Sequence, residues 1–189
     1  MHKVGILALQ GASQRHAEAV AALGAHPVEV RTPDDLAGIE GIILPGGEST
    51  TMSKLLDLSG LFDPLADRLR AGMPAFGTCA GLILLSAHIL DGRDDQRSFG
   101  VLDVDVRRNA FGRQVDSFET DLSVDGVAGG AFPAVFIRAP VVERVGHGVE
   151  VLSTVEGRAV LCRQGPLLGA AFHPELSDDL RLHQLFLEG

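Results

Sequence analysis

The sequence predicts an α/β fold: a three-layer sandwich with a mostly parallel central sheet and an antiparallel extension. In the first half of the 189-residue chain, apolar strand-like runs alternate with helix-like segments, which is the pattern of a parallel sheet covered by helices. In the second half, short β-rich runs are separated by turns. Because neither an internal repeat nor a long linker divides the sequence, we expect one domain over residues 1–189.

Local patterns predict the elements of the first half. Residues 4–9 are apolar throughout and precede Gly11, as in a strand buried on both faces. Ser13 is placed to cap a helix that runs to about Leu23, and Gly24 closes that helix. The expected strands that follow are residues 27–31, 41–44 and 75–76, and the expected helices are about 51–58, 63–70 and 82–87.

The β-rich runs of the second half favour an antiparallel extension or edge of the same sheet. A last helix fits residues 178–187, where Leu180, Leu182, Leu185 and Phe186 supply the apolar positions. The expected strands are residues 101–106, 135–137, 149–153, 159–162 and 168–172.

Composition and charge exclude several classes of function. A formal net charge of −9 and a pI near 5.1 leave no basic face for general nucleic-acid binding. The first apolar stretch is too short for a secretion signal, and the longest uncharged stretch, residues 73–90, contains a proline and glycines that disfavour a membrane helix. Two cysteines in different contexts, Cys79 and Cys162, suggest no disulfide framework. We therefore expect a cytoplasmic protein without nucleic-acid or membrane partners.

Glycine-bearing loops follow three of the expected parallel strands. These loops are residues 10–11, 45–49 and 77–81. The carboxyl ends of parallel strands lie at one edge of a sheet, and ligands bind outside that edge. The three loops should therefore converge on one site.

The loop at residues 77–81 predicts a nucleophile at Cys79. The order Gly77-Thr78-Cys79-Ala80-Gly81 resembles the strand–turn–helix elbow in which glycines two residues either side of a nucleophile let strand and helix approach closely. The helix N-terminus would stabilise a thiolate, and the Ala80 amide would face a developing oxyanion. The alternative is that Cys79 is a small buried residue in a packing turn, an interpretation that suits Cys162 well.

A thiol nucleophile needs a base, and His173 is the candidate. In an extended segment residues i and i+2 share a side, so His173 and Glu175 would lie side by side, with Pro174 fixing the backbone between them. Glu175 would then hold the imidazole tautomer. The remaining histidines have no acid placed to orient them, and we expect them to be solvated or packing residues: His2, His16, His26, His88, His147 and His183.

The loop at residues 45–51 and two arginines predict a substrate pocket. The loop glycines permit close backbone approach, and free amides there suit an anion or an oxyanion. A phosphate loop is disfavoured because the Gly-Lys-Ser/Thr ending is missing, and Ser49 or Thr50 is expected to cap the following helix. Arg108 and Arg138 are candidates for binding a carboxylate, although the sequence leaves ion-paired or solvated arginines equally open.

These motifs, taken together, resemble the triad-type class I glutamine amidotransferases, and within them the glutaminase subunits of pyridoxal 5′-phosphate synthases. The runs that carry the resemblance span nearly the whole chain in order: LALQG (7–11), LPGGESTTM (44–52), FGTCAGL (76–82), RNAFGRQVDSF (108–118), FIRAP (136–140) and FHPEL (172–176). The elbow and His-Pro-Glu mark the superfamily, whereas residues 108–118 and 136–140 point to the subfamily. Residues 25–39, 91–97 and 123–132 carry little of the family pattern.

The resemblance implies a flavodoxin-like fold and a role for each matching residue. Cys79, His173 and Glu175 would form the catalytic triad, with no metal or cofactor. Gln10 would help to form the oxyanion site, which the Gly46–Gly47 peptide would complete together with Ala80. The implied contacts with L-glutamine are Gly47, Glu48, Ser49, Arg108, Ile137 and Arg138.

The resemblance also implies a partner. The ammonia released from glutamine would pass to a (β/α)₈-barrel synthase subunit, which joins it with a pentose phosphate and a triose phosphate, and docking of that subunit would turn the Gly46–Gly47 peptide. Three rival hypotheses remain: a glutaminase subunit of another ammonia-using synthase, a DJ-1-like cysteine-elbow hydrolase or chaperone, and a binding module with an inactive site. The adjacent pair His173 and Glu175 counts against the second.

Overall fold

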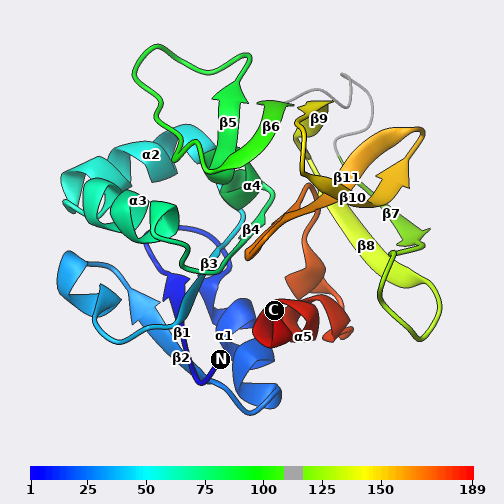
Figure 1. Ribbon diagram of the computed structural model, residues 1–189, viewed down its shortest axis with the longest axis horizontal. Helices are drawn as coiled ribbons and strands as arrows, with labels where there is room; N and C mark the ends of the chain where they lie inside the picture. Colours follow the sequence, from blue (N-terminus) through cyan, green and yellow to red (C-terminus); the bar gives the residue numbers. More distant parts are fainter. Residues whose placement is uncertain (109–116) are drawn as a thin grey trace.

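The central sheet of the computed structural model has seven strands in the order β10-β11-β12-β4-β3-β1-β2 within the described residues, 1–108 and 117–189 (Figure 1). The pairs β1-β2, β1-β3, β3-β4 and β4-β12 are parallel, whereas β10-β11 and β11-β12 are antiparallel. The strands are β1 Lys3–Leu7, β2 His26–Val30, β3 Gly41–Leu44, β4 Ala75–Thr78, β10 Glu150–Val155, β11 Arg158–Gln164 and β12 Leu167–Ala170. The predicted parallel sheet with an antiparallel extension is confirmed.

Helices cover both faces of this sheet. Figure 1 shows α2, α3 and α4 on one side and α1 and α5 on the other. The helices are α1 Ser13–Ala22, α2 Ser49–Leu58, α3 Phe62–Arg70, α4 Ala80–Leu85 and α5 Arg181–Glu188, with 3-10 turns η1 Pro33–Leu36 and η2 Pro174–Leu176. Because helices lie on both sides, every residue of β3 and β4 is buried.

The remaining strands form two small sheets, which corrects the expectation that all the later runs extend the main sheet. One small sheet has the order β5-β6-β9 and the other pairs β7 with β8. These strands are β5 Ser86–Ile89, β6 Leu102–Arg107, β9 Val141–Val145, β7 Ser117–Leu122 and β8 Phe132–Ile137. In β6 and β8 the residues on one face are buried and those on the other face are more accessible, so these strands belong to one-sided sheets.

Several of the expected helix ends are wrong, and the last helix begins at Arg181, three residues later than expected. Ser13 is the first helical residue of α1 and makes no capping hydrogen bond, because Ala12 occupies the cap position. The expected helix over 82–87 ends at Leu85, where Ser86 becomes extended and its hydroxyl donates a 2.7 Å hydrogen bond to the Ile83 carbonyl. Gly24 does close α1, with a positive φ of 81°.

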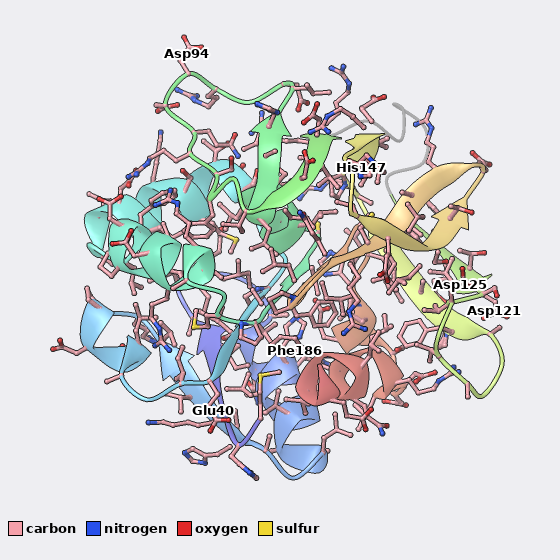
Figure 2. All side chains as sticks on the ribbon, in the orientation of Figure 1. Glu40, Asp94, Asp121, Asp125, His147 and Phe186 are labelled. Carbon is pink, nitrogen blue, oxygen red and sulfur yellow. The ribbon has the colours of Figure 1, made fainter. Side chains whose placement is uncertain are left out.

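The hydrophobic core contains several large aromatic side chains. Phe76, Phe132, Phe136 and Phe172 are among the largest fully buried side chains. Figure 2 shows Asp94 and Asp121 at the outer edge of the molecule and Phe186 near its centre, beside α5. Within residues 1–108 and 117–189, no helix is long and apolar enough to cross a membrane.

Candidate active site

Cys79 lies at a strained turn between β4 and α4. Its φ and ψ of 49° and −102° are unusual for a residue with a side chain. Its amide donates a 2.8 Å hydrogen bond to the Ala170 carbonyl at the end of β12, which ties the turn to the neighbouring strand. The structure thus has the elbow predicted from the sequence, with Cys79 at the carboxyl edge of the sheet.

Glycines at both sides of the elbow are required by close backbone contacts. A Cβ on Gly77 would lie 2.6 Å from the Gly81 carbonyl carbon, and a Cβ on Gly81 would lie 1.9 Å from the Leu44 carbonyl oxygen. Both distances are far below any real Cβ contact, so the backbones of β4, α4 and β3 meet here without room for side chains. The spacing of Gly77 and Gly81 about Cys79 therefore has a direct steric cause.

His173 and Glu175 are paired through a hydrogen bond. His173 Nδ1 lies 2.8 Å from Glu175 Oε1, and the His173 amide donates to the Val135 carbonyl at 2.9 Å. The expected side-by-side placement is right, but the extended backbone assumed for it is wrong. Residues Pro174–Leu176 form a 3-10 turn, which begins with proline and is closed by the Leu176 amide bonding to the His173 carbonyl.

The electrostatics of the pair favour an imidazolium beside a carboxylate. Burial acts to lower the pKa of His173, but hydrogen bonds to Cys79 and Glu175 outweigh it and raise that pKa to about 10. Burial acts to raise the pKa of Glu175, but the hydrogen bond from His173 and electrostatic interactions with the neighbouring imidazoles lower it overall. Cys79 is 7% exposed, and Glu175 is 4% exposed. His173 and Glu175 can therefore hold opposite charges in a site with little access to solvent.

Two histidines that the sequence did not connect with the site lie behind Glu175. His16 Nε2 is 3.4 Å from Glu175 Oε2, and His16 Nδ1 is 2.9 Å from His183 Nε2. The expectation that no acid orients the remaining histidines is thus wrong for His16, and also for exposed His88, whose Nδ1 lies 2.8 Å from Asp105. The expectation holds for His2, His26 and His147, which are exposed, and for His183, which is buried and contacts the imidazole of His16.

A cavity of about 300 Å³ opens beside Cys79 and His173. Its lining includes all six residues expected to contact the substrate, and Ile83 joins them from α4. The full lining is Gly47, Glu48, Ser49, Cys79, Ile83, Arg108, Ile137, Arg138 and His173. The loops that the topology brings to one edge therefore converge as predicted.

Of the residues expected to stabilise an oxyanion, Gly47 lines this cavity, whereas Gln10, Gly46 and Ala80 do not. Gly46 packs against the site so closely that a Cβ would lie 2.3 Å from His173 Cε1 and 3.4 Å from the Cys79 Cβ. Gln10 Oε1 accepts a 3.3 Å hydrogen bond from the Glu48 amide. Ala80 is the first residue of α4, where backbone amides have no partner within a helix.

Glu48 caps helix α2, which corrects the expectation of a cap at Ser49 or Thr50. The carboxylate of Glu48 accepts hydrogen bonds from the amides of Thr50 at 3.0 Å and Thr51 at 2.7 Å. Burial acts to raise the pKa of Glu48, but the hydrogen bonds with Thr51 and Thr50 lower it to about 2. A carboxylate at this position satisfies two free amides of the helix and stays ionised.

Gln96 connects Arg108 with the pocket loop, a role that no sequence motif indicates. Arg108 Nη1 donates to Gln96 Oε1 at 3.0 Å and to Thr50 Oγ1 at 2.6 Å. Gln96 Nε2 donates in turn to Ser49 Oγ at 3.0 Å. Arg108 Nε is buried and has no hydrogen-bond partner in the described part of the chain. Asp91 Oδ1 lies 3.9 Å from this Nε as an ion-pair partner. The guanidinium is therefore held in place at the wall of the cavity.

Two further expectations concern metals and the run at 108–118. Within the described residues, no group of three or more histidine, cysteine, aspartate or glutamate side chains is arranged to hold a metal ion. Residues 109–116 of the run at 108–118 lie outside the described residues.

Comparison with known proteins places this geometry among glutamine amidotransferases. The SNO glutamine amidotransferase family matches residues 6–189. Proteins named pyridoxal 5′-phosphate synthase subunit PdxT from Parafrankia sp. (strain EAN1pec) and Mycobacteroides abscessus are each 56% identical, covering 98% of this chain and 92% and 95% of those proteins. A solved structure titled as a glutamine amidotransferase is 50% identical with a TM-score of 0.92, covering 98% of this chain and 97% of that one.

Proposed function

Because the chain belongs to the SNO glutamine amidotransferase family, we propose that it is the glutaminase subunit of a pyridoxal 5′-phosphate synthase. Relatives 56% identical over nearly the full length carry that name. The observation that carries the chemistry is the hydrogen bond between His173 and Glu175 beside Cys79, at the edge of a cavity of about 300 Å³. The same observation disfavours an inactive binding module, because a module without chemistry has no need of an ionised carboxylate buried against a histidine.

The first half of the reaction forms a thioester. The Cys79 thiolate attacks the side-chain amide carbon of glutamine, forming a carbon–sulfur bond and moving the carbonyl π electrons to oxygen. Amides of Ala80 and of the Gly46–Gly47 loop hold that oxyanion. The imidazolium of His173 gives its proton to the departing nitrogen, so ammonia leaves as the carbonyl re-forms, while Glu175 keeps the imidazole oriented.

The second half returns the enzyme to its starting state. Neutral His173 takes a proton from water, whose oxygen attacks the thioester carbon. Collapse of the second tetrahedral intermediate breaks the carbon–sulfur bond and releases glutamate. The thiolate of Cys79 and the imidazolium of His173 are then ready for another glutamine.

The α-carboxylate of glutamine is assigned to the arginine side of the cavity. The presence of the Arg108 and Arg138 guanidinium groups in the cavity lining supports this assignment. Arg138 and Ile137 line the same cavity and are proposed to complete the contact, with Gly47, Glu48 and Ser49 on the opposite loop. The Glu48 carboxylate is already bonded to Thr50 and Thr51, so Glu48 is proposed to act through its backbone.

The proposed partner is a (β/α)₈-barrel synthase subunit that consumes the ammonia. We assign residues 1–189 to one glutaminase domain that works in the cytoplasm as part of a hetero-oligomer. Docking would turn the Gly46–Gly47 peptide so that its amide faces the oxyanion, with Gln10 supporting the loop through the Glu48 amide. In this proposal the isolated subunit is poised but slow.

A glutaminase assay with and without the matching synthase subunit tests the proposal. Ammonia release from the complex should disappear in Cys79→Ala. Cys162→Ala is the matched control, because burial raises the pKa of the Cys162 thiol to about 11 and that residue lies in β11 outside the cavity. Ammonia release that survives Cys79→Ala would refute the mechanism. Activation only by a different ammonia-using synthase would refute the assigned pathway and leave the mechanism standing.

A further inference from the structure

A chain of buried imidazoles continues from Glu175 into the interior of the protein. Glu175 contacts His173 through Oε1, and His16 Nε2 lies 3.4 Å from its other oxygen, Oε2. Within the described part of the chain, Glu175 Oε2 is buried and makes no hydrogen bond, so the 3.4 Å contact with His16 Nε2 is an ion-pair distance. His16 reaches His183 at 2.9 Å, and both imidazoles are fully buried.

The charge of Glu175 determines which nitrogens of these rings carry protons. An ionised carboxylate only accepts hydrogen bonds, so its charge favours an Nε2–H on His16, which lies 3.4 Å from Oε2 and 3.4 Å from the Thr78 hydroxyl. Neutral His16 then has a bare Nδ1, and His183 must donate its own Nε2–H across the 2.9 Å contact. This leaves His183 Nδ1 as a bare acceptor without a partner among the described residues, which costs less than an unpaired N–H.

The opposite tautomers are disfavoured at both ends of the chain. A His16 with its proton on Nδ1 would turn a lone pair toward Glu175 Oε2. It would also force His183 to accept at Nε2 and to bury an N–H at Nδ1 that has no partner in the described residues. The first arrangement therefore leaves an acceptor unpaired at His183 Nδ1, whereas the opposite one leaves an N–H unpaired there.

We propose that His16 is a positioning residue, which holds Glu175 in the orientation that grips His173, while His183 holds His16 in the required tautomer. His16 lies on α1 and takes no place in the lining of the cavity, so it acts through Glu175 and contacts no substrate. The inference rests on the proposed glutaminase function. It adds two residues to the machinery and assigns each a proton.

Both imidazoles are neutral at neutral pH in this arrangement. Burial lowers the pKa of His16 to about 4, against the opposing effect of Glu175, and burial with His16 lowers the pKa of His183 to about 3. The titratable groups that face His16 are Glu175, His173 and His183, from η2, the segment before it and α5. From β4, the Thr78 hydroxyl lies 3.4 Å from His16 Nε2.

A pair of substitutions at His16 separates positioning from packing. His16→Gln keeps an N–H near the place of Nε2, whereas His16→Phe keeps a ring and removes the donor. With the synthase subunit present, His16→Phe should lower kcat about tenfold, the scale of losing one hydrogen bond to a charged group, and leave KM for glutamine unchanged. His16→Gln should restore most of kcat. Full kcat in folded His16→Phe, or a Gln variant no better than Phe, would overturn the proposal.

The unmodified chain offers a test that needs neither folding of a variant nor a partner. Nitrogen-15 NMR of histidine-labelled protein at pH 7 should show His16 and His183 neutral and protonated at Nε2. A proton on Nδ1 of His16, or an imidazolium there, would overturn the inference. If no synthase subunit elicits ammonia release, the proposed function fails. The role of His16 is still decided by the tautomers of the unmodified chain and by the rate at which iodoacetamide alkylates Cys79 in His16→Phe.

Discussion

His173 Nδ1 lies 2.8 Å from Glu175 Oε1 although the backbone between them turns through a 3-10 helix. An extended His-Pro-Glu segment was expected to give the same pairing by alternation. The turn brings the carboxylate inward, where Glu175 is 4% exposed. The pair therefore works in a buried setting, where a charge matters more than it would at the surface.

Replacing Glu175 by Gln should remove that charge while keeping the shape. The pKa of His173, which burial lowers and hydrogen bonds to Cys79 and Glu175 raise to about 10, should fall. The alkaline limit of kcat should move to lower pH, and kcat at neutral pH should fall at least about a hundredfold, as when the carboxylate of a catalytic triad becomes an amide. A pH–rate profile of the complex measures both. Glu188→Gln, at the exposed end of α5, is the control; an unchanged profile in Glu175→Gln would contradict the assignment.

Gly46→Ala should block the site without unfolding the protein. Its methyl group would lie 2.3 Å from His173 Cε1, so the imidazole must move away from Cys79. We expect glutaminase activity to fall at least about tenfold while the melting temperature changes little. Gly24→Ala is a demanding control, because its φ of 81° strains an alanine but its Cβ meets nothing within 4 Å. That control should lose stability and keep its activity; the reverse pattern would count against the steric explanation.

Gln96→Ala should weaken glutamine binding more than it slows the chemistry. The amide of Gln96 accepts from Arg108 and donates to Ser49, so its loss frees two groups of the cavity lining. We expect KM to rise about tenfold, the effect of about 1.4 kcal/mol, with a smaller change in kcat. Gln184→Ala removes only an exposed bond to Glu188 and should leave both constants unchanged. A change confined to kcat in Gln96→Ala would contradict this role.

Acid should destabilise the fold through His16 and His183. Burial lowers the pKa of His16 to about 4 and of His183 to about 3. Below about pH 6.5 the unfolded chain therefore binds protons at these imidazoles that the folded chain does not bind. Stability from this source is full above about pH 6.5 and is lost as pH falls towards about 4, by about 3 kcal/mol for His16 alone. Glu175, whose pKa is lowered, acts in the same direction at lower pH.

Urea unfolding between pH 7 and pH 4 measures this loss. His183→Leu should flatten the dependence of the unfolding free energy on pH, whereas His26→Gln, at an exposed position, should leave the slope as it is. Equal slopes in all three proteins would show that the buried imidazoles do not govern acid stability.

The sequence predicted the parts of the site whose cause is local. Gly77 and Gly81 flank Cys79 within five residues, and His173 and Glu175 are separated by one residue. His16 and His183 escaped prediction because they meet across 167 positions of the chain. Helical periodicity marks the buried face of α1 but says nothing of which side chain lies opposite.

The sequence also predicted the central strands of the fold but not the partners of the later strands. Continuous apolar runs identified β1 and β3, because central parallel strands are buried on both faces. The partners of later strands could not be read in the same way. Phe118 of β7 stacks on Phe136 of β8 at 4.5 Å, but each residue belongs to a short alternating run that would also fit the edge of the main sheet.

The position of β4 has a consequence for synthesis of the chain on the ribosome. Its two neighbours are β3, made before it, and β12, which begins at Leu167 near the end of the chain. Until that last neighbour emerges, a nascent chain presents the strand that leads to Cys79 as an open apolar edge, which is prone to pairing with other chains. We expect ribosome-bound intermediates arrested before residue 167 to need chaperone protection.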